Sequence, residues 1–276
     1  MEKEALEQAI IDFVEKSPEN YLGQDVALRP DLAGMRFFEK PLICYAAAND
    51  TLFTEYKKNE IIGPHHLSPA EWLTGAKTVI SIFLPFTAQI RTANRQSMEL
   101  GCDEWVHGRI EGQLFQNSLC RFIEETLKKE GFSALAPMTD PKMGRGSAPD
   151  VPRSDERFHT SNWSERHAAY AAGLGTFSLS KGLITQKGVA GRYISVITNA
   201  SFEPDTRSYK GLDDYCIKCG ACMRNCKGNA ITMENGKLHY PCTVFQATIR
   251  AQFEPRFGCG KCQVKVPCEE KVPLKQ

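Results

Sequence analysis

Eight of the 11 cysteines in this 276-residue chain lie close together near its C-terminus, between Cys216 and Cys268. The chain begins with MEKEALEQ, which has neither a signal-peptide core nor a twin arginine. Its longest apolar stretches fall short of the roughly 18 residues that a membrane span needs. We therefore expect a cytoplasmic protein without a membrane partner, in which a dense cysteine cluster indicates metal or redox chemistry rather than disulfides.

The first four of these cysteines form a tight run with the spacing C-x2-C-x2-C-x3-C, made by Cys216, Cys219, Cys222 and Cys226. Bacterial ferredoxins use this spacing, normally closed by a proline, whereas Lys227 follows here. Three thiolates from one loop reach three irons of a single cubane, and the fourth lies too far along and ligates the neighbouring cluster. The run predicts [4Fe-4S] binding.

The other four cysteines are spaced less regularly and are Cys242, Cys259, Cys262 and Cys268. Sixteen residues separate the first two of them, and five separate the last two. By the crossed rule of two-cluster ferredoxins, Cys268 completes the cluster of Cys216, Cys219 and Cys222, and Cys226 joins the remaining three. Since eight cysteines hold two four-iron clusters, we expect two [4Fe-4S] clusters.

Zinc and disulfides are the alternative interpretations of these cysteines. Two C-x2-C pairs, Cys219/Cys222 and Cys259/Cys262, would make one four-cysteine zinc site. That site would leave four further cysteines over, and a zinc ribbon needs no third cysteine at x2 spacing. Iron–sulfur binding is therefore favoured. We expect the three cysteines outside the cluster to be ordinary buried or half-buried thiols, namely Cys44, Cys102 and Cys120.

Upstream of the cysteines, helical and strand patterns alternate. Apolar residues recur at helical spacing near the N-terminus, over about 108–130 and in a short segment over about 163–172. Dense β-branched runs at 78–84 and 193–198 predict buried strands. The alternation predicts an α/β or α+β domain over 1–205, followed by a cysteine-rich domain over 206–276.

The charge of the chain is nearly balanced, with 34 basic and 33 acidic residues and a formal net charge of +1. Nucleic-acid-binding proteins usually carry a strong basic excess. The composition as a whole therefore gives no support for nucleic-acid binding, although a local basic patch stays open.

Residues 165–175 read E-R-H-A-A-Y-A-A-G-L-G, which resembles the E-R-x-x-A-x-x-A-G-L-G stretch of the epoxyqueuosine reductase family. Residues 216–231 are similar to that family's C-x2-C-x2-C-x3-C-P-x-x-A-I segment. Cys242 matches its isolated cysteine, which is followed by a C-x2-C pair and a last cysteine. The resemblance covers about residues 75–270 in order, and respiratory reductive dehalogenases share the same core more distantly.

This resemblance implies an α+β chain in which a corrinoid-binding domain of nitroreductase-like fold precedes a two-cluster ferredoxin-like module. In the family, the two [4Fe-4S] clusters deliver electrons to the cobalt of cobalamin, which reduces the substrate. The implied partners are an electron donor, such as a ferredoxin or flavodoxin, and a small-molecule or nucleoside-type substrate. The part of the family that packs near the corrinoid matches Gly173, Leu174, Gly175 and Gly191. Glycines let a backbone approach a bulky cofactor closely, but Gly173 fits a helix C-cap equally well.

The chain departs from the family at two further points. The family has D-S-A-P-x-x-E-R, with the aspartate as proton donor, and this chain places His159 at the position of that aspartate. His159 is thus the candidate catalytic residue, since histidine donates protons near neutral pH. The alternative is that residues 150–162 form an exposed loop in which His159 is solvated. The family's helical-repeat region, which helps to grip tRNA, has no counterpart in the eight residues after Cys268, so we expect no tRNA grip of that kind.

Two functions follow as hypotheses. The first is a cobalamin-dependent iron–sulfur reductase. The second is a ferredoxin-type electron-transfer protein that relays electrons to a partner without binding cobalamin.

Overall fold

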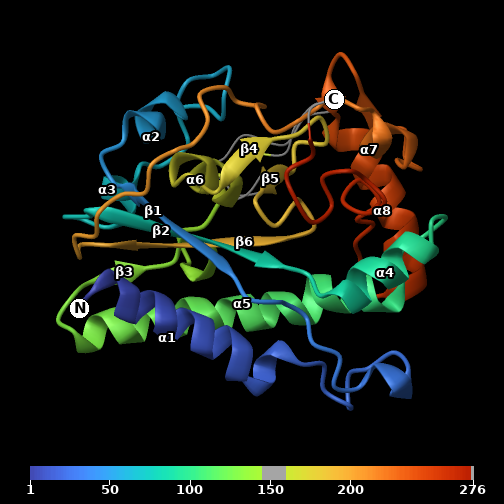
Figure 1. Cartoon of the computed structure of the whole chain (residues 1–276), viewed down its shortest axis with the longest axis horizontal. Helices are drawn as coiled ribbons and strands as arrows, with labels where there is room; N and C mark the ends of the chain where they lie inside the picture. Colours follow the sequence, from blue (N-terminus) through green and yellow to red (C-terminus); the bar gives the residue numbers. More distant parts are fainter. Residues whose placement is uncertain (145–159, 275–276) are drawn as a thin grey trace.

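The computed structural model describes residues 1–144 and 160–274, and its centre is a four-stranded sheet (Figure 1). The strand order is β1-β2-β6-β3, and every neighbouring pair is antiparallel. The strands are β1 (Leu42–Ala47), β2 (Thr78–Pro85), β3 (Ala134–Leu135) and β6 (Gly191–Thr198). Both strands predicted from β-branched runs are confirmed, and β2 is buried along its whole length. An antiparallel sheet with flanking helices makes the fold α+β.

Helices cover both faces of this sheet (Figure 1). On one face lie α1 (Lys3–Lys16) and α5 (Asp103–Lys129), and on the other lies α6 (Glu165–Ala171). The helix predicted over about 108–130 begins earlier than expected, because its first turn carries acidic residues that favour a helix start and buries Trp105 and Val106. It ends as predicted at Gly131, whose φ of 84° belongs to the left-handed region.

The remaining elements are short, apart from one helix in the cysteine-rich segment. Two hairpins, β4–β5 and β7–β8, are antiparallel. The elements are α2 (Thr51–Glu55), α3 (Pro69–Trp72), α4 (Ala88–Gln96), β4 (Gly175–Phe177), β5 (Leu183–Thr185), α7 (Ala221–Arg224), β7 (Ile231–Thr232), β8 (Gly236–Lys237) and α8 (His239–Phe253), with 3-10 turns at Pro18–Asn20, Pro30–Leu32 and Pro137–Thr139.

The cysteine-rich segment packs against the upstream part of the chain rather than standing apart from it. In Figure 1, α8 lies beside α4. The backbone N–H of Val189 donates to the carbonyl of Cys268 at 2.9 Å, and Arg256 Nε donates to Glu111 at 2.8 Å. Side chains from both parts share one apolar cluster that includes Ile184. These contacts hold the cysteine-rich segment against the upstream part of the chain. The domain boundary between residues 205 and 206 stays a prediction.

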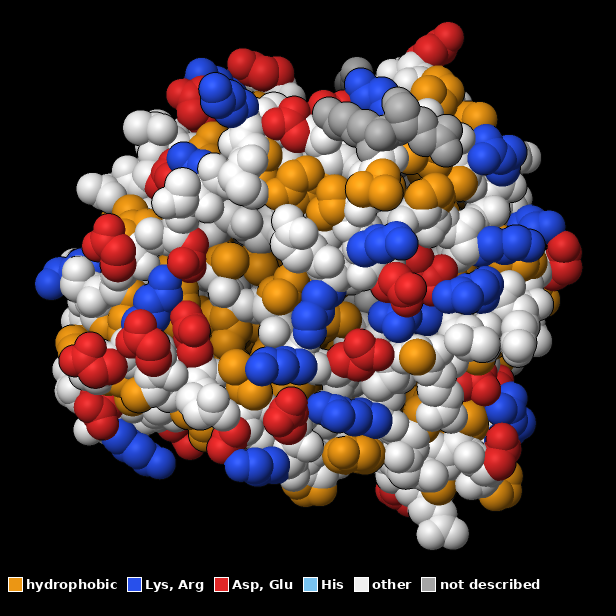
Figure 2. Space-filling view, in the orientation of Figure 1, with side chains coloured by type: hydrophobic (Ala, Val, Ile, Leu, Met, Phe, Trp, Pro, Cys, Tyr) orange, Lys and Arg blue, Asp and Glu red, His pale blue; other side chains and the backbone are white. Residues whose placement is uncertain are grey.

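Figure 2 shows Lys and Arg side chains interspersed with Asp and Glu on one face of the molecule. This mixture matches the nearly balanced charge of the sequence. Within 1–144 and 160–274, no helix has both the length and the apolar character that crossing a membrane requires.

Candidate functional site: two cysteine sets beside a recess

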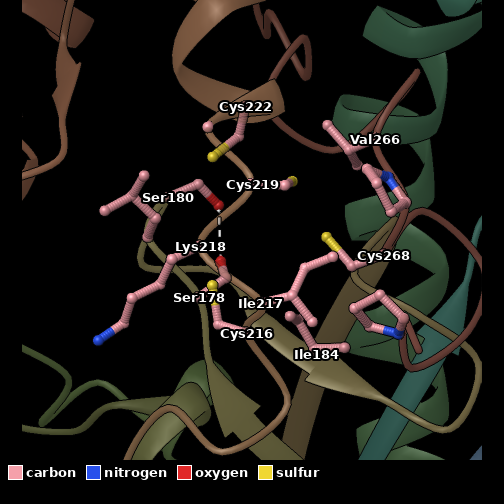
Figure 3. Close-up of a pocket in the computed structure, with 14 residues that line it drawn as sticks. Ser178, Ser180, Ile184, Cys216, Ile217, Lys218, Cys219, Cys222, Val266 and Cys268 are labelled. Atoms are coloured by element: carbon pink, nitrogen blue, oxygen red, sulfur yellow. Dashed lines mark hydrogen bonds between the residues drawn. The ribbon is translucent and has the colours of Figure 1, made fainter. Parts of the chain in front are cut away.

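Four cysteines surround a hollow at the surface end of the cysteine-rich segment (Figure 3). This first set consists of Cys216, Cys219, Cys222 and Cys268. Three of its members come from the tight run, and Cys268 comes from the far end of the chain. The rest of the lining includes apolar side chains, such as Ile184 and Val266, and the hydroxyls of Ser178 and Ser180. The structure therefore brings together the four residues that the crossed assignment groups.

The backbone around the first set is bent so that its thiols face inward. Lys218 and Gly220 have φ values of 51° and 70°, so the run doubles back before α7 begins. Burial, followed by the charges of the other cysteines, raises the pKa of Cys222 and of Cys268 to about 12. Thiols buried in this way stay protonated at neutral pH unless a metal displaces the proton.

The second set consists of Cys226, Cys242, Cys259 and Cys262. Burial raises the pKa of Cys262, and the charges that act on it further include those of Cys242 and Cys226. Burial also raises the pKa of Cys259 to about 11, with contributions from Cys262 and Cys242. The two sets are neighbours, because Cys262 of the second set acts on the pKa of Cys222 in the first and members of both sets pack in one cluster.

Hydrogen-bond donors reach two sulfurs of the second set. The Ala230 backbone N–H donates to Cys226 Sγ at 3.3 Å, and Gln246 Nε2 donates to Cys242 Sγ at the same distance. N–H donors to sulfur are a common feature of iron–sulfur sites, where they tune the cluster.

The spacing of the thiols bears on the zinc alternative. In the part of the chain that the structure describes, no three His, Cys, Asp or Glu side chains converge on one point where a single metal ion would sit. A tetrahedral zinc site needs four sulfurs, each about 2.3 Å from the ion. The first set lines a hollow, and its assignment to a [4Fe-4S] cluster stays a prediction.

Arg166, His167, Tyr193 and Lys237 form a group beside the second set, and we call the space that they share the recess. The Arg166 side chain is exposed to solvent, yet burial of its charge by surrounding protein lowers its pKa. We infer from these two conditions that the surface at Arg166 is hollowed. Tyr193 is half-buried, and desolvation likewise raises its pKa well above the ordinary value. The charges of Tyr193 and Cys262 both act on the pKa of Arg166, so the recess adjoins the second cysteine set.

The Glu-Arg pair of α6 anchors one wall of this recess. Ser195 Oγ on β6 donates to Glu165 Oε2 at 2.6 Å and accepts from Trp163 Nε1 at 3.0 Å. The next residue on the helix is turned by about 100°, and Arg166 donates to the carbonyl of Lys181. Glu165 thus fixes the helix to the sheet while Arg166 faces the recess.

The residues predicted to pack near a corrinoid have packing roles in the polypeptide itself. Gly173 has a φ of 94° and ends α6, as the helix C-cap interpretation expects. A Cβ on Gly175 would lie 1.9 Å from the carbonyl oxygen of Ile184, and one on Gly191 would lie 2.4 Å from that of Leu84. Leu174 is buried. The contact of these residues with a corrinoid stays a prediction.

His159 lies outside the described residues, so its role as proton donor also stays a prediction. Two histidines were not singled out from the sequence, His167 of the recess and His66, whose charge acts on His167. Burial, then the charges of Arg166 and His66, lowers the pKa of His167 to about 3. Burial, then His65, lowers the pKa of His66 to about 4. His66 stacks on Trp163 at 5.6 Å. The sequence feature that could have pointed to His167 is its place directly after Glu165 and Arg166.

We expect this burial to make stability depend on pH. Neutral His66 is retained in the folded state down to about pH 4, whereas the unfolded chain binds a proton below about pH 6.5. His66 alone should therefore lower the free energy of unfolding by about 2 kcal/mol as pH drops from 6.5 to 5, and His167 acts in the same direction. Urea unfolding monitored by tryptophan fluorescence measures this, and His66→Phe should remove the part of the dependence that His66 contributes. An equal pH dependence in the variant would contradict this assignment.

No protein-family model and no curated protein sequence matches this chain. Solved structures do resemble it. An epoxyqueuosine reductase bound to an epoxyqueuosine-modified tRNA-Tyr stem loop has a TM-score of 0.53 at 17% identity, covering 96% of this chain and 66% of its own length. The epoxyqueuosine reductase from Bacillus subtilis has a TM-score of 0.50 at 16% identity, covering 98% and 67%.

A reductive dehalogenase, described as B12-dependent, has a TM-score of 0.52 at 16% identity and covers 84% of this chain. This chain spans 30% of the length of that dehalogenase and about two thirds of the length of the epoxyqueuosine reductases. At sequence identities this low, the similarity shows only that the folds are alike. The chain has the fold that epoxyqueuosine reductases and reductive dehalogenases share, as the sequence resemblance implied.

Proposed function

We propose that this chain is an iron–sulfur oxidoreductase in which two [4Fe-4S] clusters pass electrons to a corrinoid held at the recess. The observation that carries the proposal is the order of the three sites. Cys219 of the first set is exposed at the surface, the second set touches the first, and Cys262 of the second set adjoins Arg166 in the recess. Electrons would enter at the first cluster and leave from the second.

The recess has walls suited to an organic cofactor with polar edges. Arg166 and Lys237 supply positive charges. The hydroxyl of Tyr193 donates to the carbonyl of Leu183 at 2.6 Å, so the Tyr193 ring would form part of the wall. Gly173, Leu174, Gly175 and Gly191 would support the corrinoid from below through their backbone. When bound, a corrinoid supplies a strongly reducing cobalt centre. His159 would supply the proton for the reduction.

The substrate we propose is small or nucleoside-type. Support comes from the fold shared with an epoxyqueuosine reductase whose structure contains a modified tRNA stem loop. A ferredoxin or flavodoxin would serve as electron donor, because a low-potential one-electron carrier suits an iron–sulfur entry site.

Anaerobic reconstitution should yield about eight irons and about eight acid-labile sulfides per chain, as two four-iron clusters require. Incubation with cobalamin followed by desalting should leave cobalamin bands in the visible spectrum. Arg166→Met should weaken cobalamin retention while leaving the iron content unchanged. Full iron without cobalamin retention would instead identify a ferredoxin-type electron carrier, and about four irons with bound zinc would refute the two-cluster assignment.

A further inference from the structure

The two segments that carry the first cysteine set are basic, although the chain as a whole is nearly neutral. Residues 216–231 and 259–274 together contain six Lys and Arg residues but only two Glu residues, whereas the whole chain has a formal net charge of +1. The six are Lys218, Arg224, Lys227, Lys261, Lys265 and Lys271. The local basic patch that the overall composition left open therefore coincides in sequence with the first set.

The two glutamates of these segments are engaged by arginines of α4 (Ala88–Gln96). Glu269 is buried and accepts from the Arg95 guanidinium, and Glu270 pairs with Arg91 at 3.3 Å. The glutamate charges are therefore balanced by α4, and they leave cations of their own segments uncompensated.

Three of the six cations are exposed and pair with no carboxylate in the part of the chain that the structure describes. They are Arg224, Lys265 and Lys271. Of the others, Lys218 and Lys227 pair with carboxylates at 2.9 Å and 2.6 Å, and Lys261 is buried. The uncompensated charge of this region is thus carried by exposed side chains.

These three cations lie next to the lining of the first hollow. Arg224 Nη1 donates to the carbonyl of Cys219 at 3.0 Å. Lys265 and Lys271 lie on either side of residues 266–268, which line the hollow. Cys219 is itself exposed, so positive charge and a cluster-ligand cysteine share one accessible face.

The same face carries two exposed apolar side chains. Pro267 lines the hollow and is exposed, and Leu274, which follows the lining residue Pro273, is 86% exposed. Protein interfaces combine an apolar centre with charged positions around it. A nucleic acid would gain from the cations, but its phosphates would gain nothing from exposed apolar side chains. The combination therefore suits a protein partner.

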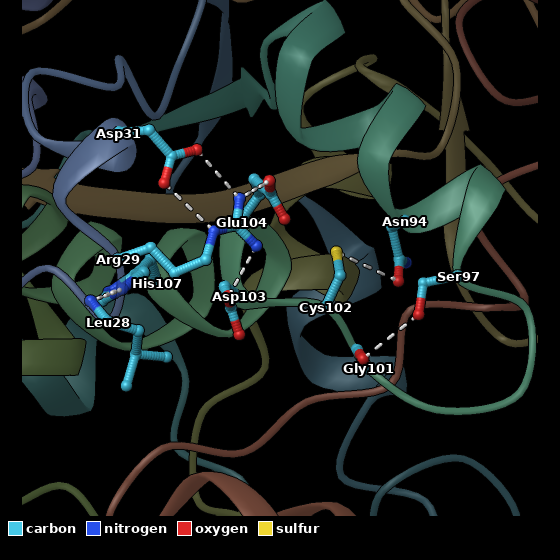
Figure 4. A network of polar contacts seen from close by, with 10 residues as sticks. All are labelled: Leu28, Arg29, Asp31, Asn94, Ser97, Gly101, Cys102, Asp103, Glu104 and His107. Atoms are coloured by element: carbon cyan, nitrogen blue, oxygen red, sulfur yellow. Dashed lines mark hydrogen bonds and ion pairs between the residues drawn. The ribbon is translucent and has the colours of Figure 1, made fainter.

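A second hollow, between α4, α5 and α8, lacks uncompensated charge at its cation. Arg29 lines it and pairs with Asp103 at 2.7 Å and with Glu104 at 2.9 Å (Figure 4). An acidic partner would meet carboxylates there as well as the guanidinium. The face at the first hollow is therefore the better match for such a partner.

We propose that a small acidic electron-transfer protein docks on this face, over Cys219, and reduces the first cluster there. The inference rests on the proposed function, whose first cluster it requires. One electron passes from the carrier, which is oxidised, to the cluster, which is reduced. Because electron transfer weakens steeply with distance, the carrier has to cover the exposed ligand. Complementary charge steers such a partner and speeds its encounter, and salt screens this effect.

The test is stopped-flow reduction of the reconstituted protein by a [2Fe-2S] ferredoxin of strongly negative net charge, reduced beforehand. Lys265→Asn/Lys271→Gln should lower the second-order rate constant about fivefold at low salt. The difference from wild type should vanish at about 0.3 M salt. Asparagine is chosen because Lys265 has a φ of 54°, which asparagine tolerates.

The matched control is Lys128→Gln/Lys129→Gln, which removes the same charge from two exposed lysines at the C-terminal end of α5. This end lies far from α7 in Figure 1, so the rate constant should not change. Equal slowing in the control and the double variant would show that only net charge acts, and would overturn the docking face.

Iron content, measured first, separates this inference from the proposed function. A wild-type protein without two clusters would refute the proposed function and the docking proposal with it. With about eight irons in each protein, a wild-type rate constant no higher than that of the double variant overturns the docking proposal alone. Loss of binding to a labelled RNA, with ferredoxin reduction unchanged, would likewise overturn it and assign the patch to nucleic acid. If the double variant binds less iron, Lys271→Gln decides alone, since no described residue pairs with the Lys271 side chain.

Discussion

Replacing Cys268 by alanine should remove about four of the eight irons, and the lost cluster should be that of Cys216, Cys219 and Cys222. Cys268 is nearest in sequence to Cys262, but it lines the hollow of the first set. Its backbone carbonyl accepts from Val189 at 2.9 Å, which fixes the residue there independently of metal. EPR of the dithionite-reduced variant should show one isolated cluster instead of two interacting ones.

The matched control for this variant is Cys120→Ser. Cys120 is fully buried in the main core, on α5 beneath the sheet, and belongs to neither cysteine set. Its replacement should leave the iron content at about eight, although a buried hydroxyl lowers the free energy of unfolding by about 1–2 kcal/mol. If Cys268→Ala keeps both clusters, or if Cys120→Ser loses as much iron, the ligand assignment is wrong.

Gly260→Ala should be strongly destabilising and should also release the second cluster. Gly260 has a φ of 66°, and an added Cβ would lie 2.0 Å from the Trp105 ring. Trp105 is itself buried and packs on Phe86 at 4.8 Å, so it has little room to move. Backbone strain and overpacking together should lower the free energy of unfolding by about 3 kcal/mol. Urea unfolding and iron analysis measure the two effects.

Gly34→Ala separates strain from overpacking. Gly34 has a φ of 80°, close to that of Gly260, but nothing lies within 4 Å of an added Cβ. This variant should lose only about 1 kcal/mol and keep its iron. Equal losses of unfolding free energy in the two variants would show that Trp105 moves aside, and would contradict the tight packing of Trp105 against Gly260.

Several elements of the fold follow from local patterns, and others do not. The dense apolar runs that became β2 and β6 predict buried strands because nearly every residue in them faces a core. The β4 and β5 strands have three residues each, too few for a period to show. The helix α8 carries Pro241 in its first turn, where proline is tolerated, yet a proline in a sequence reads as a break.

The sequence pattern also could not predict that the strands of the sheet are antiparallel. Strand pairing joins residues far apart in the chain, such as Ser81 and Ser195. Alternation of helices and strands fits both parallel and antiparallel arrangements, so the pattern left α/β and α+β open. Only the register of β2 against its neighbours resolves this point.

For the site, the sequence by itself determined the cysteine run, because three thiols spaced at x2 must share one loop whatever surrounds them. The tertiary structure decided which distant residues join that loop. It placed Cys268 in the first hollow, set Arg166 beside Cys262 and buried Lys261 against Asn94. Lysine is almost never fully buried, so no local pattern would have predicted it there. Spacing encodes geometry over a few residues, whereas burial and charge neighbourhoods arise only when remote segments pack together.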